Sequence, residues 1–153
     1  MMRIGVVSDS HEMSDLKLTR IASLLRKQSI ALLIHLGDGA SDGAALGRML
    51  EVPVIGVCGN CDFRSNLPAE TVRKVEGAKL LICHGHALNV KMSLMRLQLR
   101  AEEVGACVAL YGHTHIQRAD DGLILLLNPG ALPLEQYAVL HIDGGRVAYT
   151  LHA

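Results

Sequence analysis

The chain has 153 residues, of which 50% are hydrophobic and 20% are charged, as expected for one globular domain of ordinary size. Its 15 lysines and arginines balance its 15 aspartates and glutamates, so the sequence lacks the excess basic charge typical of proteins that bind long nucleic acids. Because no apolar stretch reaches the length of about 18 residues that a membrane span needs, and no secretion signal opens the chain, we expect a cytoplasmic protein without a membrane partner.

The first part of the chain alternates short apolar runs with helical patterns. Residues 2–7, 31–36 and 53–57 are short and rich in aliphatic side chains, which predicts three buried strands. Apolar residues recur at helical spacing over residues 16–28, behind a cap at Ser14 or Asp15, and a shorter helix is predicted over residues 43–50. This order of strands and helices predicts parallel strands joined by right-handed crossovers.

The second part of the chain predicts antiparallel pairing as well. Residues 70–75 and 78–83 form a predicted hairpin, and a helix over residues 90–104 ends at Gly105 before a strand over residues 106–110. Two further hairpins join residues 117–119 to 123–127 and residues 137–142 to 146–151. The sequence therefore predicts a single α/β domain, residues 1–153, in which two mixed sheets pack face to face between helical layers.

Side chains that can bind metal ions follow five of the predicted strands. In open α/β sheets, ligands bind beyond the carboxyl ends of the strands, and this is where these side chains fall. The candidate ligands are Asp9, His11, Asp38, Asn60, His84, His113 and His115. A single histidine at a strand end is more often structural, and a single aspartate there is more often a helix cap. The combination at successive strand ends instead predicts a metal centre.

The two histidines of the last motif are separated by one residue. If the backbone of residues 113–115 is extended, His113 and His115 lie on the same face and both reach into one cleft. Thr114 would then point away from that cleft.

Seven ligands exceed the needs of one ion and suit two ions that share a carboxylate. Two divalent ions about 3.5–4 Å apart bind the oxygens of a phosphoryl group and lower the pKa of a bridging water. Attack of that metal-bridging hydroxide on phosphorus, in line with the leaving oxygen, is the chemistry that the pattern favours. The mixed ligand types lead us to expect Mn²⁺, with Ni²⁺, Fe or Zn²⁺ as alternatives.

Five motifs resemble, in order and spacing, those of the calcineurin-like metallophosphoesterases, and most closely the small phosphodiesterases of the YfcE type. These motifs are Asp9-Ser10-His11, Gly37-Asp38, Gly59-Asn60-Cys61-Asp62, His84-Gly85-His86 and Gly112-His113-Thr114-His115. The resemblance implies a four-layer α/β/β/α sandwich. It also implies two metal ions, the first held by Asp9, His11 and His115, the second by Asn60, His84 and His113, with Asp38 as the bridge.

The sequence departs from that family at Cys61, where many larger members have a histidine that stabilises or protonates the leaving oxygen. A thiol is a poorer general acid at neutral pH, so we expect activity on esters with good leaving groups. The candidate catalytic residues are Asn60, Cys61 and His86. For His86 the two readings are a substitute acid and a residue that orients a metal ligand.

The residues after the third strand suggest how the site is completed. Asp62 is expected either to bond a ligand or to shape its loop. Phe63 and Arg64 follow on a loop as candidate substrate-binding residues. Arg64 suits a substrate phosphate, although a solvated surface arginine is the alternative. The spacing of Cys58 and Cys61 matches redox motifs, but no helix follows them, which argues against a redox role.

The leading hypothesis is a phosphodiesterase with a dinuclear metal centre that acts on small phosphate esters. The alternative is a catalytically weak metal-binding scaffold, like the retromer subunit that has this fold but degraded metal motifs. All seven ligand positions carry the expected residue types here, which favours the enzyme. The sequence leaves open a homo-oligomer, either a dimer or a tetramer.

Overall fold

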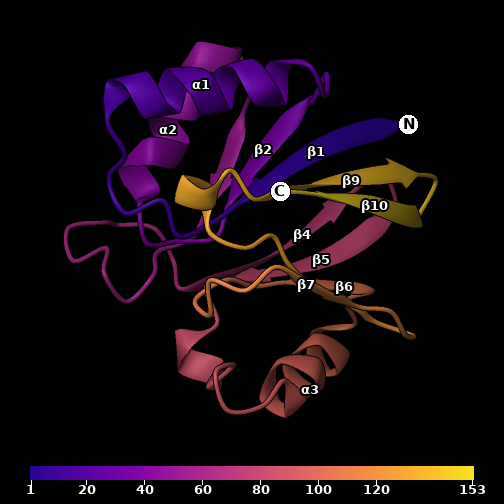
Figure 1. Cartoon of the computed structure of the whole chain (residues 1–153). Coiled ribbons are helices and arrows are strands. Elements are labelled where there is room, and N and C mark those ends of the chain that lie inside the picture. The colour runs from indigo at the N-terminus through magenta and orange to yellow at the C-terminus, as the bar shows by residue number, and fades with distance from the viewer.

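The computed structural model describes all 153 residues, which form four layers (Figure 1). Two five-stranded sheets occupy the middle, with α1 and α2 outside one of them and α3 outside the other. The helices are α1 (Asp15–Arg26), α2 (Ala40–Leu50) and α3 (Met95–Val104). The predicted α/β/β/α sandwich is therefore confirmed.

Both sheets are mixed, as predicted. The first has the strand order β10-β9-β1-β2-β3, and the second has the order β4-β5-β6-β8-β7. Strands β1, β2 and β3 are parallel to one another, as are β5, β6 and β8, while the remaining strands pair antiparallel. The bounds are β1 (Met2–Val7), β2 (Leu32–His35), β3 (Val54–Gly56), β4 (Glu70–Val75), β5 (Ala78–Cys83), β6 (Val108–Leu110), β7 (Arg118–Asp120), β8 (Leu125–Asn128), β9 (Tyr137–Asp143) and β10 (Arg146–His152).

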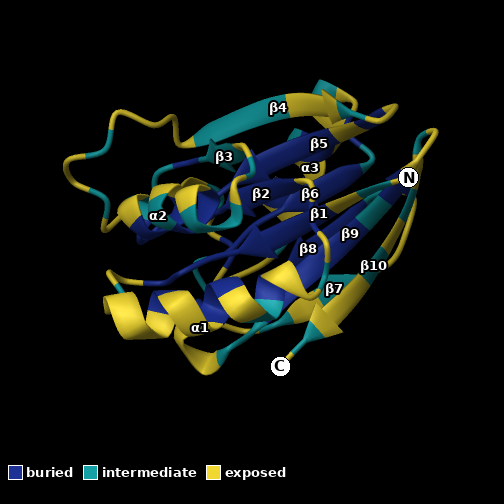
Figure 2. Cartoon of the chain, turned by 90° about the horizontal axis from the view of Figure 1, so that it is seen from above, coloured by how far each residue is buried: buried dark blue, intermediate teal, exposed yellow.

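Three hydrophobic clusters correspond to the three interfaces between the four layers. The largest, with 16 buried residues, takes side chains such as Ile34 and Leu110 from facing strands of the two sheets. Successive side chains of a strand point to opposite faces of the sheet. Leu33, which precedes Ile34, therefore packs on the other face, in the same cluster as Ile21 of α1. A third cluster joins Leu97 of α3 to the second sheet. Figure 2 shows central strands such as β2 and β9 as buried, whereas edge strands such as β4 and β10 and the helices are partly exposed.

Two helices begin several residues away from the start that the sequence pattern predicts. Helix α2 begins at Ala40 rather than at residue 43, because the carboxylate of Asp62 accepts its first backbone N–H groups and replaces a local cap. Helix α3 begins at Met95 rather than at residue 90. A 3₁₀ turn, η1 (His86–Leu88), and the left-handed Asn89 precede it, and Ser93 Oγ accepts the N–H of Met95. Helix α1 begins at Asp15, one residue before the predicted range, behind Ser14, which is one of the two predicted caps.

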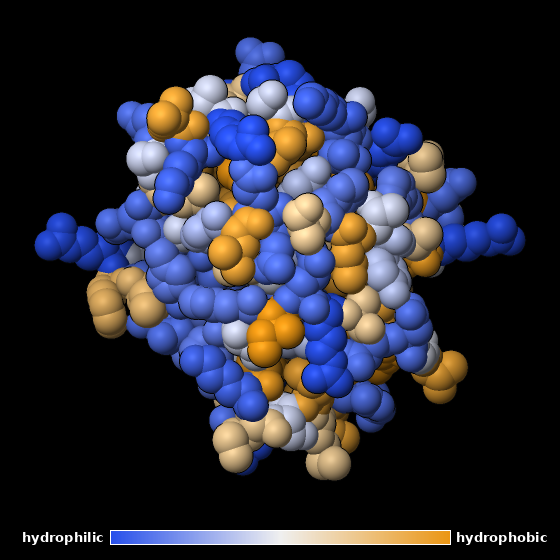
Figure 3. All heavy atoms as spheres, in the orientation of Figure 1, coloured by the Kyte–Doolittle hydropathy of each residue, from blue (hydrophilic) through white to orange (hydrophobic).

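None of the helices combines the length and apolar character that crossing a bilayer would take. Large hydrophobic side chains that are exposed come from separate elements, among them Leu16, Phe63, Met92 and Leu123. On the face shown in Figure 3, hydrophobic residues accordingly lie in small groups among hydrophilic ones.

Candidate metal centre

Six of the seven predicted ligands converge beyond the carboxyl ends of β1, β2, β5 and β6. Their ligating atoms form three overlapping groups, and within each group all these atoms lie within 4.8 Å of one another. The groups are Asp9, His11 and His115; His11, Asp38 and Cys61; and Asp38, His84 and His113. Parallel strands in two facing sheets thus deliver side chains from distant parts of the sequence to one edge of the sandwich.

Each of the two carboxylates has one hydrogen-bonded oxygen and one oxygen that faces histidines. Asp9 Oδ2 accepts from Ser8 Oγ at 2.6 Å and from the N–H of His113 at 3.0 Å. Asp9 Oδ1 is buried without a hydrogen-bond partner and lies 3.2 Å from His115 Nε2. Asp38 Oδ1 accepts the N–H of Cys61 at 2.8 Å, and Asp38 Oδ2 lies 3.3 Å from His84 Nε2. The chain therefore presents one free oxygen from each carboxylate to the cleft.

The histidines face one another through ring nitrogens. His11 Nε2 and His115 Nε2 are 3.3 Å apart, and His113 Nδ1 and His84 Nε2 are 3.2 Å apart. Among these four histidines, His84 has a tautomer that is fixed by a hydrogen bond to the backbone. It donates from Nδ1 to the carbonyl of Leu36 at 2.7 Å, which leaves the lone pair of Nε2 directed at the cleft. This arrangement is the usual one for a histidine that binds a metal ion.

These residues fit a divalent metal centre. Two buried carboxylates lie side by side, because oxygens of both Asp9 and Asp38 are within 4.0 Å of His11 Nε2 and within 3.9 Å of His84 Nε2. Buried negative charges and an orphaned carboxylate oxygen are costly unless cations pair with them. Imidazole and carboxylate donors together suit first-row ions such as Mn²⁺, Fe, Ni²⁺ and Zn²⁺.

The backbone around the site is left-handed at five of the predicted ligands. They are Asp9 (φ 55°), His11 (φ 53°), Asp38 (φ 56°), His113 (φ 72°) and His115 (φ 62°). The backbone is therefore not extended at His113 and His115, which was the condition for placing them on one face, although both imidazoles reach the cleft. Left-handed backbone costs roughly 1–2 kcal/mol for a residue with a Cβ, so surrounding contacts must hold it. Here the N–H of Gly112 donates to the carbonyl of His84, and Asn128 Nδ2 donates to Thr114 Oγ1.

Asp62 organises the loops that carry Asp38. Its carboxylate accepts four backbone N–H groups at 2.8–3.1 Å, from Asp38, Gly39, Ala40 and Gly59. Burial alone would raise the pKa of Asp62, but these four hydrogen bonds lower it overall, so the group is ionised at neutral pH. Of the two expectations for this residue, these contacts correspond to the shaping of the loop.

His35 belongs to the support of the site but was missed by sequence reasoning. It is buried, and its Nδ1 accepts the N–H of Gly37 at 3.1 Å. The neutral ring must then carry its proton on Nε2, which lies 2.9 Å from Ser10 Oγ and donates to it. His35 thereby joins the loop of Asp9 to the loop of Asp38. The available signal was a lone histidine at the end of an otherwise apolar strand.

His35 should make stability depend on pH. Burial lowers the pKa of His35 from 6.5 to about 4. Between these two pH values the imidazole is protonated in the unfolded chain but neutral in the folded protein. The contribution of the neutral His35 to the unfolding free energy is fully present above pH 6.5. About 3 kcal/mol of it is lost as the pH falls to 4. We expect His35→Asn to lose this part of the difference in unfolding free energy between pH 7 and pH 4, measured by urea denaturation. His141→Asn, at a half-buried position of β9, should keep it, and equal pH dependence in wild type and His35→Asn would contradict the assignment.

The predicted catalytic residues lie around the same cleft. Asn60 is exposed, and its Nδ2 donates to Cys61 Sγ at 3.6 Å. Desolvation and the charge of Asp38 raise the pKa of Cys61. Burial and neighbouring His84 lower the pKa of His86, whose ring centroid lies 5.4 Å from that of His84. Cys61 is thus a weak acid, and His86 is mostly neutral at pH 7, so neither is prepared to protonate a leaving oxygen.

A groove of about 610 Å³ adjoins the site next to Cys61. The two predicted substrate-binding residues, Phe63 and Arg64, line it together with Glu12, Ser41 and other residues of the α2 start and the 61–67 loop. Phe63 is the only phenylalanine in the chain and is 90% exposed. An aromatic ring and an unpaired guanidinium thus stand beside the metal centre.

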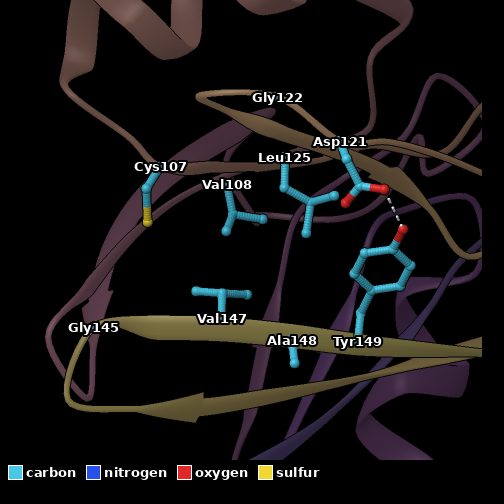
Figure 4. A pocket seen from close by; sticks show the side chains of 9 residues that line it. All are labelled: Cys107, Val108, Asp121, Gly122, Leu125, Gly145, Val147, Ala148 and Tyr149. Atoms are coloured by element: carbon cyan, nitrogen blue, oxygen red, sulfur yellow. Dashed lines mark hydrogen bonds between the residues drawn. The ribbon is translucent and has the colours of Figure 1, made fainter.

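A second pocket, of about 500 Å³, is drawn from close by in Figure 4, and its lining places it at the end of the sandwich opposite the metal centre. Val108 and Leu125 line it from the beginnings of β6 and β8, whereas the metal centre lies beyond the ends of such strands. Tyr149 of β10 crosses between the sheets and donates from its hydroxyl to Asp121 at 2.8 Å. None of the three donor groups includes a residue of this pocket, so it is separate from the metal centre.

Comparison with known proteins bears on the family of this chain. A family model, the calcineurin-like phosphoesterase superfamily domain, matches residues 2–145. A probable metallophosphoesterase of Bacillus subtilis, YsnB, is 35% identical over 150 residues, which cover 93% of this chain and 85% of YsnB.

Solved structures share the fold. The phosphoesterase YfcE of E. coli is 24% identical with a TM-score of 0.64, covering 97% of this chain and 98% of YfcE. Vps29 of Entamoeba histolytica, solved with Zn²⁺, is 20% identical with a TM-score of 0.77, covering 99% and 98% of the two chains. The extent of the family match, together with the motifs and the four-layer fold, shows that this chain belongs to the calcineurin-like phosphoesterase superfamily.

Proposed function

We propose that this protein is a phosphodiesterase with a dinuclear metal centre that hydrolyses small phosphate esters. The observation that carries the proposal is the pair of free carboxylate oxygens, Asp9 Oδ1 and Asp38 Oδ2, facing four imidazoles in one cleft. Such a set of donors on a phosphoesterase fold suits two divalent cations.

The proposed division of ligands follows the groups of ligating atoms. Asp9, His11 and His115 would hold one ion, and His84 and His113 would hold the other. Asn60, whose amide is outside these groups, is the further ligand proposed for the second ion. Asp38 is suited to bridge them, because its Oδ2 lies within 4.0 Å of both His11 Nε2 and His84 Nε2. Bound there, two divalent ions would supply an activated water and neutralise the charge of a phosphoryl group.

The residues of the chain then have distinct proposed tasks. Asp62 and His35 hold the loop of Asp38 in place against its neighbouring loops. Asn60 is exposed, where its amide can contact a phosphoryl oxygen. Cys61 and His86 remain the candidate acids for the leaving oxygen, but their pKa shifts both disfavour that role at pH 7. We therefore propose substrates whose leaving group departs without much protonation, such as aryl esters.

The groove next to Cys61 is the proposed site of the leaving group. Phe63 offers a ring for stacking, and Arg64 offers a charge for a phosphate oxygen. We expect Phe63→Ala to raise the KM for aryl phosphodiesters about tenfold while kcat changes less than about twofold, since the ring touches no ligand. Steady-state kinetics with Leu123→Ala, an exposed residue of the distant β7–β8 turn, is the control. An unchanged KM in Phe63→Ala would place the leaving group elsewhere.

The function itself is tested by removing and restoring metal. We expect the chelated protein to lose hydrolysis of aryl phosphodiesters and to regain it with two equivalents of Mn²⁺, followed in preference by Ni²⁺, Fe²⁺ or Zn²⁺. The panel should contain matched monoesters and diesters with leaving groups of graded pKa, and rates should fall steeply as that pKa rises. Absence of turnover with every ion, in a folded and metal-loaded protein, would favour the alternative of a metal-binding scaffold.

A further inference from the structure

A sulfur atom lies among the oxygen and nitrogen donors of the metal centre. Cys61 Sγ forms a group with ligating atoms of His11 and Asp38, all within 4.8 Å of one another. This group shares His11 with the group of Asp9 and His115, and it shares Asp38 with the group of His84 and His113. The family resemblance assigns this position a role toward the leaving oxygen and no role as a ligand. The thiol is therefore an unassigned donor at a site already rich in donors.

Backbone hydrogen bonds fix the thiol next to Asp38. The N–H of Cys61 donates to Asp38 Oδ1 at 2.8 Å, and the N–H of Asp38 donates to Asp62 Oδ2 at 2.8 Å. These two bonds run in opposite directions between the same two loops. Cys61 is itself one attachment point and its neighbour Asp62 is the other, so the Cβ of Cys61 cannot move far from the carboxylate of Asp38. Besides its hydrogen bond with the side chain of Asp38, the sulfur has one polar contact, a weak one of 3.6 Å from Asn60 Nδ2.

The spacing of the group suits direct ligation. Zinc binds sulfur at about 2.3 Å and imidazole nitrogen at about 2.0–2.1 Å, so one ion can join donors that are roughly 4 Å apart. Small side-chain rotations within the present 4.8 Å limit would be enough. Cys61 is also the one cysteine of the chain that is exposed, so an ion arriving from solvent meets it early.

We propose that Cys61 binds metal as a thiolate at the His11 and Asp38 side of the centre, and that it strengthens the binding of thiophilic divalent ions. The S–H bond breaks, its proton passes to solvent, and a sulfur–metal bond forms without any change of oxidation state. Zn²⁺, Co²⁺ and Cd²⁺ gain from a sulfur donor, whereas Mn²⁺ gains little. The proposal rests on the metal centre proposed above but not on its phosphodiesterase activity.

Cobalt provides the direct test. Titration of Co²⁺ into the metal-free protein should produce a near-ultraviolet sulfur-to-cobalt charge-transfer band in addition to the visible bands of bound Co²⁺. Cys61→Ser should lose the charge-transfer band and keep the visible bands. Cys107→Ser should keep both, because Cys107 lines the pocket at the opposite end of the molecule (Figure 4). Isothermal titration should show that Cys61→Ser weakens Cd²⁺ binding about tenfold or more and Mn²⁺ binding less than about twofold.

A measurement on the unaltered protein guards against a variant that does not fold. Maleimide labelling, read by peptide mass spectrometry, should modify Cys61 in the metal-free protein and be blocked there by Cd²⁺. Burial raises the pKa of Cys83 to about 12, so that thiol should stay unlabelled in both states. Labelling of Cys107 should be the same with and without Cd²⁺.

The outcomes separate this proposal from the proposed function. Visible cobalt bands without a charge-transfer band, or Cys61 labelling unaffected by Cd²⁺, would overturn thiolate ligation while leaving the metal centre intact. A charge-transfer band that survives in Cys61→Ser would also overturn it. A Cys61-dependent band in a protein that hydrolyses no ester with any ion would support the ligation and refute the phosphodiesterase.

Discussion

Asp38→Asn is expected to lower the turnover of aryl phosphodiesters on the order of a thousandfold, equivalent to about 4 kcal/mol of transition-state stabilisation. The substitution leaves an oxygen to accept the N–H of Cys61, so the local backbone has no reason to move. It replaces the oxygen that lies 3.3 Å from His84 Nε2 and 4.0 Å from His11 Nε2 by an uncharged amide NH₂. A residue that bridges two cations cannot be replaced by a group that binds neither.

Metal content distinguishes a lost bridge from a lost fold. The variant should bind one equivalent of Mn²⁺ or less, by elemental analysis after dialysis, while its circular dichroism matches the wild type. Asp121→Asn removes a carboxylate from the opposite end of the sandwich and should keep both ions and the activity (Figure 4). Two bound ions and full turnover in Asp38→Asn would show that Asp38 is not the bridge.

Much of the architecture follows from local sequence patterns. Strands such as β1 and β5 have the predicted bounds because short aliphatic runs between turn residues leave few alternatives. The approach of Asp9 to Asp38 also follows from the sequence, because β1 and β2 are parallel neighbours whose carboxyl ends lie at the same edge of one sheet. The sequence pattern therefore predicts which residues approach one another, but not the contacts that hold them in place.

The supports of the site are not written in local patterns. Asp9 and His115 have left-handed backbone, which residues with a Cβ seldom adopt, so no propensity argument would place them there. His35 acts through a ring that contacts loops on both sides, and Asp62 caps a helix that begins 22 residues earlier in the chain. Such contacts join distant segments, and a single sequence does not specify them.

Glycines reveal how tightly those segments are pressed together. A Cβ built on Gly59 would lie 2.1 Å from Asp38 Oδ1 and 2.6 Å from Asp38 N. A Cβ on Gly112 would lie 2.1 Å from Ser8 Oγ and 2.7 Å from Asp9 Oδ2. Each carboxylate of the centre is thus backed by a glycine from another strand end. The site therefore needs glycine at positions 59 and 112, because a Cβ at either position would collide with a carboxylate of the centre.

Gly59→Ala is therefore expected to destabilise the protein by about 1–3 kcal/mol and to weaken metal binding at least about tenfold. One of the clashing atoms is the backbone nitrogen of Asp38, which cannot rotate away, so the loops of Asp38 and Asn60 must separate. Their separation also breaks the hydrogen bonds that Asp62 accepts from the loop of Asp38.

The matched control for this substitution is Gly122→Ala, since the nearest atom to its added Cβ, the carbonyl oxygen of Ile124, is 3.6 Å away. That variant should lie within about 0.5 kcal/mol of wild type. Urea denaturation gives the stabilities, and Mn²⁺ calorimetry gives the affinities. Wild-type stability and two bound ions in Gly59→Ala would contradict this prediction. They would show that the two loops can accommodate a Cβ and that close backbone packing does not hold Asp38 at the centre.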